Sequence, residues 1–304
     1  MPTAQKWLQV ALALWIAVTM LTLMLRDTAS LGAGDVPQTN AGLATLAGGA
    51  GKVRQLALAT TGLADSLEGL GSFLWSGEDR ISPGALSVRR LLAKNPDMNA
   101  LYSQARLLLQ ANSAPPRIAL AFDDYPFPEF SPRLLSLLEE TQTPVTLFTI
   151  GNKLEKAPHL AALAMMHGHS LQNHTYSHPR LDALPSERVR QEWREGAQVI
   201  RALTGQNPTL SRAPGERSND EVWRESQACG MLCVDPLVSD IYDMGKSVRV
   251  IEERCLEQAG PGAILSLHDG VPETLEALPH VIGRLRARGY QFVTVEELFA
   301  PEKR

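Results

Sequence analysis

The chain has 304 residues, 44% of them hydrophobic, which is enough for one large core or for one domain with an appendage. Its formal net charge of −4 argues against nucleic acid as a partner, because nucleic-acid-binding proteins need a basic surface. The charge gives no further indication of the substrate.

The N-terminal segment, residues 1–27, is predicted to be a membrane anchor. Residues 7–25 form an uncharged apolar run between Lys6 and Arg26, and a spanning helix needs roughly 20 such residues. Lys6 favours a cytoplasmic N-terminus, which would place the rest of the chain in the periplasm or outside the cell, tethered to the inner membrane. The alternative is a secreted protein with a cleaved signal peptide, although residues 28–30 make a poor cleavage site.

Residues 28–114 are predicted to be a linker and a helical region. Residues 27–52 are rich in Gly, Ala and Thr, as flexible tethers are, and residues 53–110 show loose helical spacing of apolar side chains. Helices are expected over 85–94 and 98–110. This region carries no catalytic motif, so it is interpreted as a spacer or a docking collar.

From residue 115 to the end, short apolar strands alternate with helices, which predicts a parallel α/β domain. Strands are expected over 118–122, 145–150, 170–172, 210–212, 231–234, 263–267 and 291–294. Helices are expected over 132–140, 156–167, 186–204, 220–228, 248–258 and 275–288.

Polar residues follow four of these expected strands. Asp123 and Asp124 end the first, His174 follows the third, Arg212 ends the fourth, and His268 ends the sixth. Functional groups at the C-terminal ends of several strands are typical of a β/α barrel, so a barrel is favoured over the alternative, an open doubly wound sheet.

The combination of Asp124 with His174 and His178 indicates a metal site. One carboxylate and two imidazoles can hold a divalent ion such as zinc and leave a fourth position for water or substrate. The four-residue spacing of the histidines is expected to put both rings on one side of a helical turn. Asp123 is adjacent and can take a proton from water, and His268 can serve as general acid.

These segments together resemble the NodB-type polysaccharide deacetylases, carbohydrate esterase family four. Five motifs of that family are matched in order, and nothing before residue 115 is covered. They are residues 121–124 (Ala-Phe-Asp-Asp), 174–178 (His-Thr-Tyr-Ser-His), 212–214 (Arg-Ala-Pro), 240–244 (Asp-Ile-Tyr-Asp-Met) and 266–269 (Ser-Leu-His-Asp).

The resemblance implies a distorted β/α barrel and metal-dependent removal of acetyl groups from a glycan. Asp123 would be the general base and His268 the general acid. The metal ligands would be Asp124, His174 and His178, holding zinc, with cobalt or nickel as alternatives. Two further residues would support the acid and the base: Arg212 would orient Asp123, and Asp243, or alternatively Asp240, would tune His268.

Five residues are expected to contact the substrate, and three of them depart from the family pattern. Tyr125 stands where a glycine is usual, Met244 where a tryptophan is usual, and Ser266 where a leucine usually lines the pocket for the acetyl methyl group. Pro214 and Leu267 complete the set. The change at Ser266 could lower affinity for acetyl or admit a different acyl group.

The function expected from all this is deacetylation of an N-acetylglucosamine-containing exopolysaccharide or peptidoglycan, with glycan-synthesis or export proteins as candidate partners. Two alternatives remain: an O-acetyl esterase or non-glycan amidase on the same fold, and a non-catalytic glycan-binding subunit. The three cysteines are interpreted as buried thiols, with a Cys229–Cys233 disulfide as the alternative.

Overall fold

A computed structural model of the chain describes residues 82–111 and 116–301. The expected membrane anchor and the expected tether, residues 27–52, lie outside the described residues. Within the two described ranges, no helix is both long enough and apolar enough to cross a bilayer.

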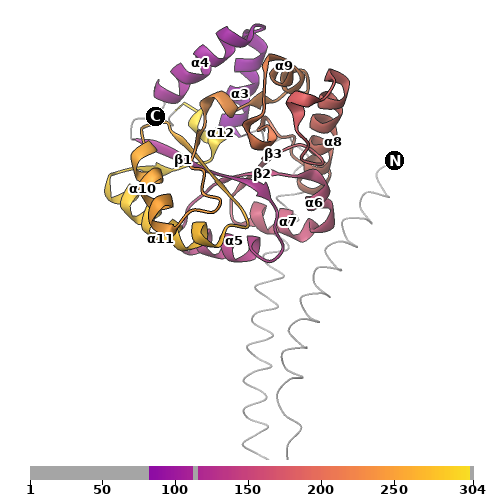
Figure 1. The fold of residues 1–304 in the computed structure, drawn as a ribbon. Helices are drawn as coiled ribbons and strands as arrows, with labels where there is room; N and C mark the ends of the chain where they lie inside the picture. Colours follow the sequence, from indigo (N-terminus) through magenta and orange to yellow (C-terminus); the bar gives the residue numbers. More distant parts are fainter. Residues whose placement is uncertain (1–81, 112–115, 302–304) are drawn as a thin grey trace, which may run out of the picture. The chain divides into compact units, whose positions relative to one another are not determined.

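The centre of the fold is an eight-stranded sheet in which every pairing is parallel (Figure 1). The strand order is β5-β4-β3-β2-β1-β7-β6, and β8 pairs with the beginning of β1. The strands are β1 (Arg117–Tyr125), β2 (Thr146–Thr149), β3 (Ser170–Asn173), β4 (Leu210–Ser211), β5 (Leu232–Cys233), β6 (Ser239–Asp240), β7 (Ile264–His268) and β8 (Gln291–Phe292). Because β5 and β6 do not pair, the predicted barrel is an open half-barrel.

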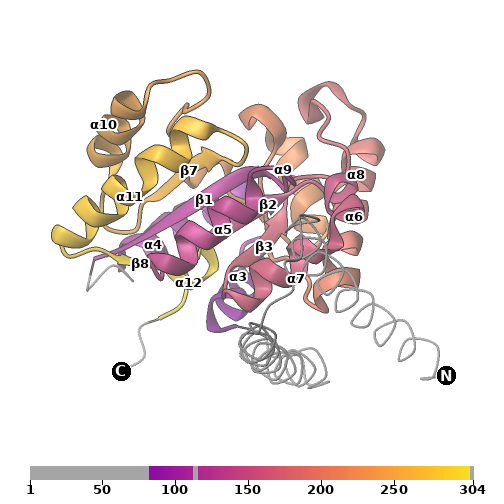
Figure 2. The ribbon, with the colours of Figure 1, turned by 90° about the horizontal axis from the view of Figure 1, so that it is seen from below.

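Helices cover the outside of this sheet. Figures 1 and 2 show α10 and α11 on one side of β1 and α6, α7 and α8 on the other, with α5 between them. The helices are α3 (Pro83–Lys94), α4 (Met98–Ala111), α5 (Ser131–Glu140), α6 (Gly151–Lys156), α7 (Pro158–Met166), α8 (Ser186–Thr204), α9 (Asp220–Ala228), α10 (Val248–Gln258), α11 (Pro272–Ala287) and α12 (Val295–Leu298).

The expected helix over residues 156–167 is present as α7, but it begins two residues later than expected, and the short helix α6 before it was not expected. The structure ends α6 at Lys156 and begins α7 at Pro158, with Ala157 between them at φ −134° and ψ 56°. The proline ring disfavours helical geometry at the residue before it, so the chain breaks there and restarts with Pro158 in the first turn.

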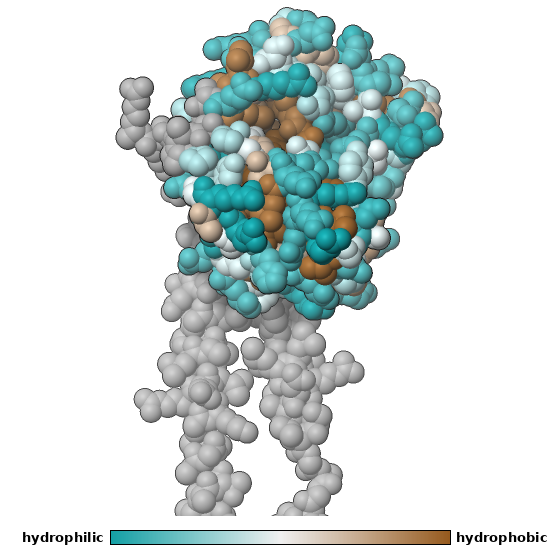
Figure 3. Space-filling model, turned by 60° about the vertical axis from the view of Figure 1, so that its left-hand side comes forward, coloured by the Kyte–Doolittle hydropathy of each residue, from teal (hydrophilic) through white to brown (hydrophobic). Residues whose placement is uncertain are grey.

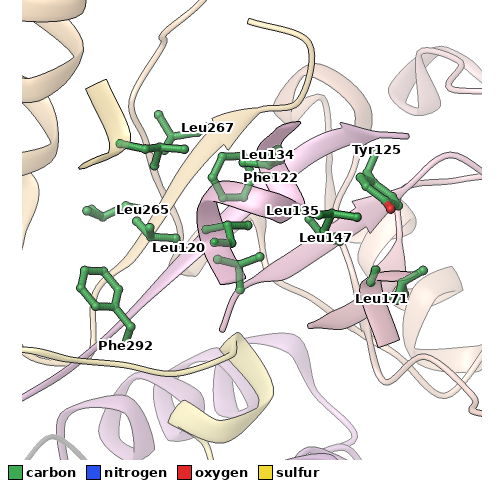
Figure 4. Close-up of a cluster of buried hydrophobic side chains, with 14 of the residues drawn as sticks. Leu120, Phe122, Tyr125, Leu134, Leu135, Leu147, Leu171, Leu265, Leu267 and Phe292 are labelled. Atoms are coloured by element: carbon green, nitrogen blue, oxygen red, sulfur yellow. The ribbon is translucent and has the colours of Figure 1, made fainter. Parts of the chain in front are cut away.

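The main hydrophobic core lies between the sheet and its outer helices (Figure 4). Alternate residues of β1 point to opposite faces of the sheet. Ile118, Leu120 and Phe122 pack outward in this core, whereas Ala119 and Ala121 belong to a second cluster inside the half-barrel. The next inward position is Asp123, so the alternation of β1 directs this carboxylate to the inside of the barrel at its C-terminal end.

The helices α3 and α4 belong to this domain, which corrects their interpretation as a spacer or docking collar. Their apolar stripe packs inside the half-barrel, with Val88, Leu91, Leu101 and Ala105 all buried. The described residues form one compact unit.

Helix α4 bridges the gap left between β5 and β6. The Tyr102 hydroxyl donates a hydrogen bond to the carbonyl of Cys233 in β5, at 2.8 Å. Leu109 is two residues before the end of α4, and Gly262 is two residues before the start of β7. Their backbones lie so close that a Cβ on Gly262 would meet the Leu109 carbonyl oxygen at 2.5 Å. A helix thus replaces missing strand pairing as the closing wall.

All three cysteines are free thiols, so the alternative Cys229–Cys233 disulfide is not formed. Cys233 and Cys255 are buried and Cys229 is partly exposed. The outer surface seen in Figure 3 is mostly hydrophilic, with hydrophobic residues in separate patches.

Candidate active site

The residues expected to be catalytic meet at the C-terminal ends of the strands. Asp123 in β1 lies directly beside His268 in β7, because the two are register partners in neighbouring parallel strands. His174 follows β3, and Arg212 follows β4, whose Ser211 pairs with Asn173. The parallel sheet therefore brings together groups that are far apart in the sequence.

Asp124, His174 and His178 form the metal-ligand cluster that the sequence predicts. One potential ligand atom from each lies within 4.8 Å of the others. Asp124 Oδ1 is 3.0 Å from His178 Nε2 and 3.7 Å from His174 Nε2. Two imidazole nitrogens and one carboxylate oxygen are a donor set that suits zinc and similar divalent ions.

The orientation of His174 also fits a metal ligand. Its Nδ1 lies 2.9 Å from the carbonyl oxygen of Arg212, which can only accept, so Nδ1 carries the proton and Nε2 is free to bind a metal. Burial lowers the pKa of His174 to about 4, which keeps the ring neutral. Burial acts to raise the pKa of Asp124, but the hydrogen bond from His178 and the nearby imidazoles outweigh it and lower that pKa to about 2.

The segment between the two histidines is a loop, so the expected helical turn is wrong. Thr175 and His178 have positive φ values of 69° and 62°, which an α-helix does not allow. The backbone N–H of His178 donates to Thr175 Oγ1 at 2.9 Å, and the N–H of Thr175 donates to Asn173 Oδ1 at 2.9 Å. Side-chain hydrogen bonds, and not helical periodicity, bring the two rings together.

Glu192 in α8 shapes this loop and was not predicted from the sequence. Its carboxylate accepts hydrogen bonds from the backbone N–H groups of Tyr176 and Ser177, at 3.1 and 2.8 Å, and from the Ser177 hydroxyl at 2.7 Å. Four residues after Glu192, Gly196 lies so close to the loop that a Cβ would meet Asn173 Oδ1 at 2.4 Å. A glutamate on a solvated helix gives no sequence signal for this role.

Asp123 has one oxygen held and one oxygen free. Its Oδ2 accepts a hydrogen bond from Arg212 Nε at 2.6 Å and another from the Ser266 hydroxyl at 3.2 Å. Its Oδ1 is buried and has no hydrogen-bond partner in the structure. A buried carboxylate oxygen without a partner is costly unless a ligand or water completes it, so Oδ1 is the atom available for proton transfer.

Arg212 is a buried guanidinium shared among three carboxylates. Besides Asp123, its NH2 group lies 3.0 Å from Glu216 Oε1 and 3.0 Å from Asp240 Oδ2. Burial acts to lower the pKa of Arg212, but the negative charges of Asp123, Asp235 and Glu216 raise it above its ordinary value, so the side chain stays charged. Asp240 therefore forms an ion pair with Arg212 and is not the partner of His268.

Asp243 is the partner of His268. Asp243 Oδ1 is 2.7 Å from His268 Nδ1, and its Oδ2 accepts hydrogen bonds from the His268 backbone N–H and the Thr274 hydroxyl. Burial alone would lower the pKa of His268, but the hydrogen bond to Asp243 and the charges of Asp123 and Asp243 raise it to about 9. Thr274, at the start of α11, is a second supporting residue that the sequence analysis did not identify.

Four of the five residues expected to contact the substrate are buried in the structure. Tyr125 lies under the site with its hydroxyl bound to the Leu160 carbonyl, and Leu267 packs in the outer core because it alternates with His268 along β7. Pro214 and Ser266 are buried as well, and Ser266 contacts the base. Met244, with 55% of its surface exposed, is the most exposed of the five.

The fold and the site define the class of protein: a half-barrel α/β hydrolase with an Asp-His-His metal site. A family model for polysaccharide deacetylase matches residues 110–234. A peptidoglycan-N-acetylglucosamine deacetylase from Bacillus cereus is 32% identical over 190 residues, covering 60% of this chain and 87% of the relative. The chain belongs to the polysaccharide deacetylase family, whose enzymes hydrolyse carbon–nitrogen bonds other than peptide bonds.

Two further relatives show the range of the family. Peptidoglycan-N-acetylmuramic acid deacetylase PdaC from Bacillus subtilis is 31% identical over 182 residues, but the match covers only 38% of its length. A PdaC structure superposes with a TM-score of 0.55 at 30% identity, covering 60% of this chain and 89% of that structure. A pseudoenzyme of the family from Bacillus anthracis superposes with a TM-score of 0.56 at 25% identity, covering 60% and 65%.

Proposed function

We propose that this protein removes N-acetyl groups from a glycan that contains N-acetylglucosamine or N-acetylmuramic acid, with peptidoglycan as the leading substrate and exopolysaccharide as the second. The observation that carries the proposal is the free Oδ1 of Asp123, a buried base placed between the Asp-His-His cluster and His268. The names of the relatives support peptidoglycan, since they act on either of its two sugars.

Asp124, His174 and His178 would hold the divalent ion, and zinc suits their donor atoms best. When bound, the ion polarises the acyl oxygen and makes water more acidic. Asp123 Oδ1 takes a proton from the attacking water, while Arg212 and Ser266 hold Oδ2 and so fix the direction of Oδ1.

His268 completes the reaction as general acid. With a pKa of about 9 it is protonated at neutral pH, and Asp243 holds its Nδ1–H, so Nε2 presents a proton to the departing amine nitrogen as the carbon–nitrogen bond breaks. The products are acetate and a glycan amine.

The direct test is acetate release by the full chain from peptidoglycan and from N-acetylglucosamine oligomers, with and without a chelator and added zinc or cobalt. We expect release that the chelator abolishes and added metal restores. Release from O-acetyl esters or small amides only would support the esterase or amidase alternative. Glycan binding without any release would support a non-catalytic role, as in the family pseudoenzyme, and either result would overturn the proposal.

We further propose that residues 7–25 anchor the protein in the inner membrane with the catalytic domain in the periplasm. The uncharged run between Lys6 and Arg26 supports this, as does the extracytoplasmic location of peptidoglycan. Extraction of membranes with alkaline carbonate tests the anchor: an anchored chain stays in the pellet. A shortened chain in the soluble fraction would favour a cleaved signal peptide.

A further inference from the structure

Tyr242 is an exposed aromatic residue, next in the chain to the Asp243 that binds His268, and no step of the proposed reaction uses it. Among the described residues, five large hydrophobic side chains are exposed, and two of them, Tyr242 at 61% and Met244 at 55%, flank the buried Asp243 that holds His268. Exposed apolar surface rimmed by polar residues is typical of ligand-binding sites, whereas a single exposed apolar side chain has no such meaning.

The tyrosine is held in place by hydrogen bonds at both ends. Its hydroxyl donates to Glu216 Oε2 at 3.1 Å, and its backbone N–H donates to Asp240 Oδ1 at 2.6 Å. Both carboxylates are also bound by the buried Arg212, so the four residues form a closed ring of contacts. An exposed ring anchored in this way is preorganised for contact, because little rotamer freedom remains to be lost on binding.

The backbone around this ring of contacts is strained. Tyr242 has a φ of 50° and Glu216 a φ of 55°, values that bulky residues rarely adopt. Such strain persists only where surrounding contacts enforce it, and it concentrates at ligand sites. A surface tyrosine without a role in binding would not require this conformation.

We propose that Tyr242 is a carbohydrate-binding platform on which a pyranose ring of the glycan stacks, next to the sugar that loses its acetyl group. This inference rests on the proposed function and names the class of ligand: a chain of at least two N-acetylated hexosamines. A pyranose presents a face of C–H groups that packs on an aromatic ring, while its hydroxyl groups stay in water or reach polar residues. Met244 extends the same apolar surface on the other side of Asp243.

The test compares Tyr242→Ala and Tyr242→Phe with a matched control, Met166→Ala, which truncates another exposed large hydrophobic side chain on α7. The full chain, loaded with zinc, is assayed for acetate release from N-acetylglucosamine oligomers of one to five sugars. Tyr242→Ala should raise KM for the tetramer about tenfold and leave kcat within about twofold. Tyr242→Phe keeps the ring and should change KM by less than about threefold, and Met166→Ala should change nothing.

Chain length separates this proposal from a structural role. If Tyr242 acts by stacking, the KM effect grows with the number of sugars and vanishes for the monomer. An equal loss of kcat on all lengths would show that Tyr242 acts through Glu216 and Arg212 on the base, and would overturn the proposal, as would an unchanged KM for the tetramer. Calorimetry measures the affinity of the tetramer for the same variants independently of turnover. Equal affinity of the wild type and Tyr242→Ala would overturn the proposed stacking platform. Absence of acetate release by the wild type from every glycan would instead overturn the proposed function.

Discussion

Replacing Asp243 by Asn should move the alkaline limit of catalysis. The carboxylate is buried at 0% exposure and accepts hydrogen bonds from His268 and Thr274, so an isosteric amide keeps the shape and removes the charge. In the wild type the pKa of His268 is raised from 6.5 to about 9, and the hydrogen bond to Asp243 is the largest of the effects that raise it. Without that bond and the charge of Asp243, only the charges of Asp123 and Asp124 oppose the effect of burial, so we expect the pKa of His268 to fall to about its ordinary value of 6.5.

The size of the effect follows from the fraction of protonated acid. At pH 8 a group with a pKa of about 9 is about 90% protonated, and one with a pKa of 6.5 about 3%, so Asp243→Asn should lower kcat at that pH about thirtyfold from this cause alone. The same shift bears on stability. Because the folded pKa is the higher one, the surroundings of His268 as a whole, with Asp243 as the main stabilising contact, contribute roughly 3 kcal/mol below pH 6.5, and this is lost as the pH rises through about 9.

The assay is kcat for acetate release as a function of pH, together with an NMR titration of the His268 ring. Glu252→Gln is the control, because Glu252 makes a similar contact with His280, at 2.9 Å, on the exposed surface. We expect the control to leave the profile unchanged. If Asp243→Asn kept an alkaline limit near pH 9, either His268 would not be the acid or Asp243 would not set its pKa.

Three further substitutions test the rest of the site. Asp123→Asn should abolish turnover while the protein still binds one metal ion per chain, whereas His174→Ala should lose both turnover and metal. Metal analysis and acetate release measure these two properties. Normal turnover of Asp123→Asn would refute the assignment of Asp123 as the base. Ser266→Ala should lower kcat about tenfold, the effect of one hydrogen bond to a charged group of about 1.5 kcal/mol, and an unchanged kcat would mean that Arg212 alone fixes Asp123. Glu192→Ala should weaken zinc affinity and lower the free energy of unfolding by about 2 kcal/mol or more, because two backbone N–H groups lose their acceptor. Competition with a chelating dye measures the affinity, and urea unfolding measures the stability. Unaltered affinity would show that the loop keeps its shape without Glu192.

Local signals predicted much of the helical layer. Helices α8, α9 and α10 have the bounds expected from the sequence, since clear stop and cap residues delimit them. Gly205 ends α8 with a φ of 72°, and Asn219 caps α9 by accepting from two backbone N–H groups. The short strand β6 was missed, because two residues carry no periodicity and its pairing with β7 is a purely tertiary event.

The convergence of Asp124, His174 and His178 could also be predicted, because the order of the motifs and the parallel strands bring them together. What could not be predicted is how buried polar groups are shared. The family resemblance predicted Asp243 as the partner of His268, with Asp240 as the alternative, but nothing in the sequence indicates that Asp240 binds Arg212. The sequence also does not show that the Ser266 hydroxyl donates to Asp123, because this hydrogen bond depends on the tertiary arrangement of β1 and β7.

The closing wall of the half-barrel is built by α3 and α4, nearly all of which precedes the segment that the family model matches, residues 110–234. A protein fragment that began at residue 110 would therefore lack the helices that cover the inside of the half-barrel. Ala119, Phe148, Leu210 and Ile264 would face water in place of the buried stripe of α3 and α4. Such a fragment would be expected to aggregate although every catalytic residue is present, so the unit to express and engineer is longer than the unit that sequence comparison delimits.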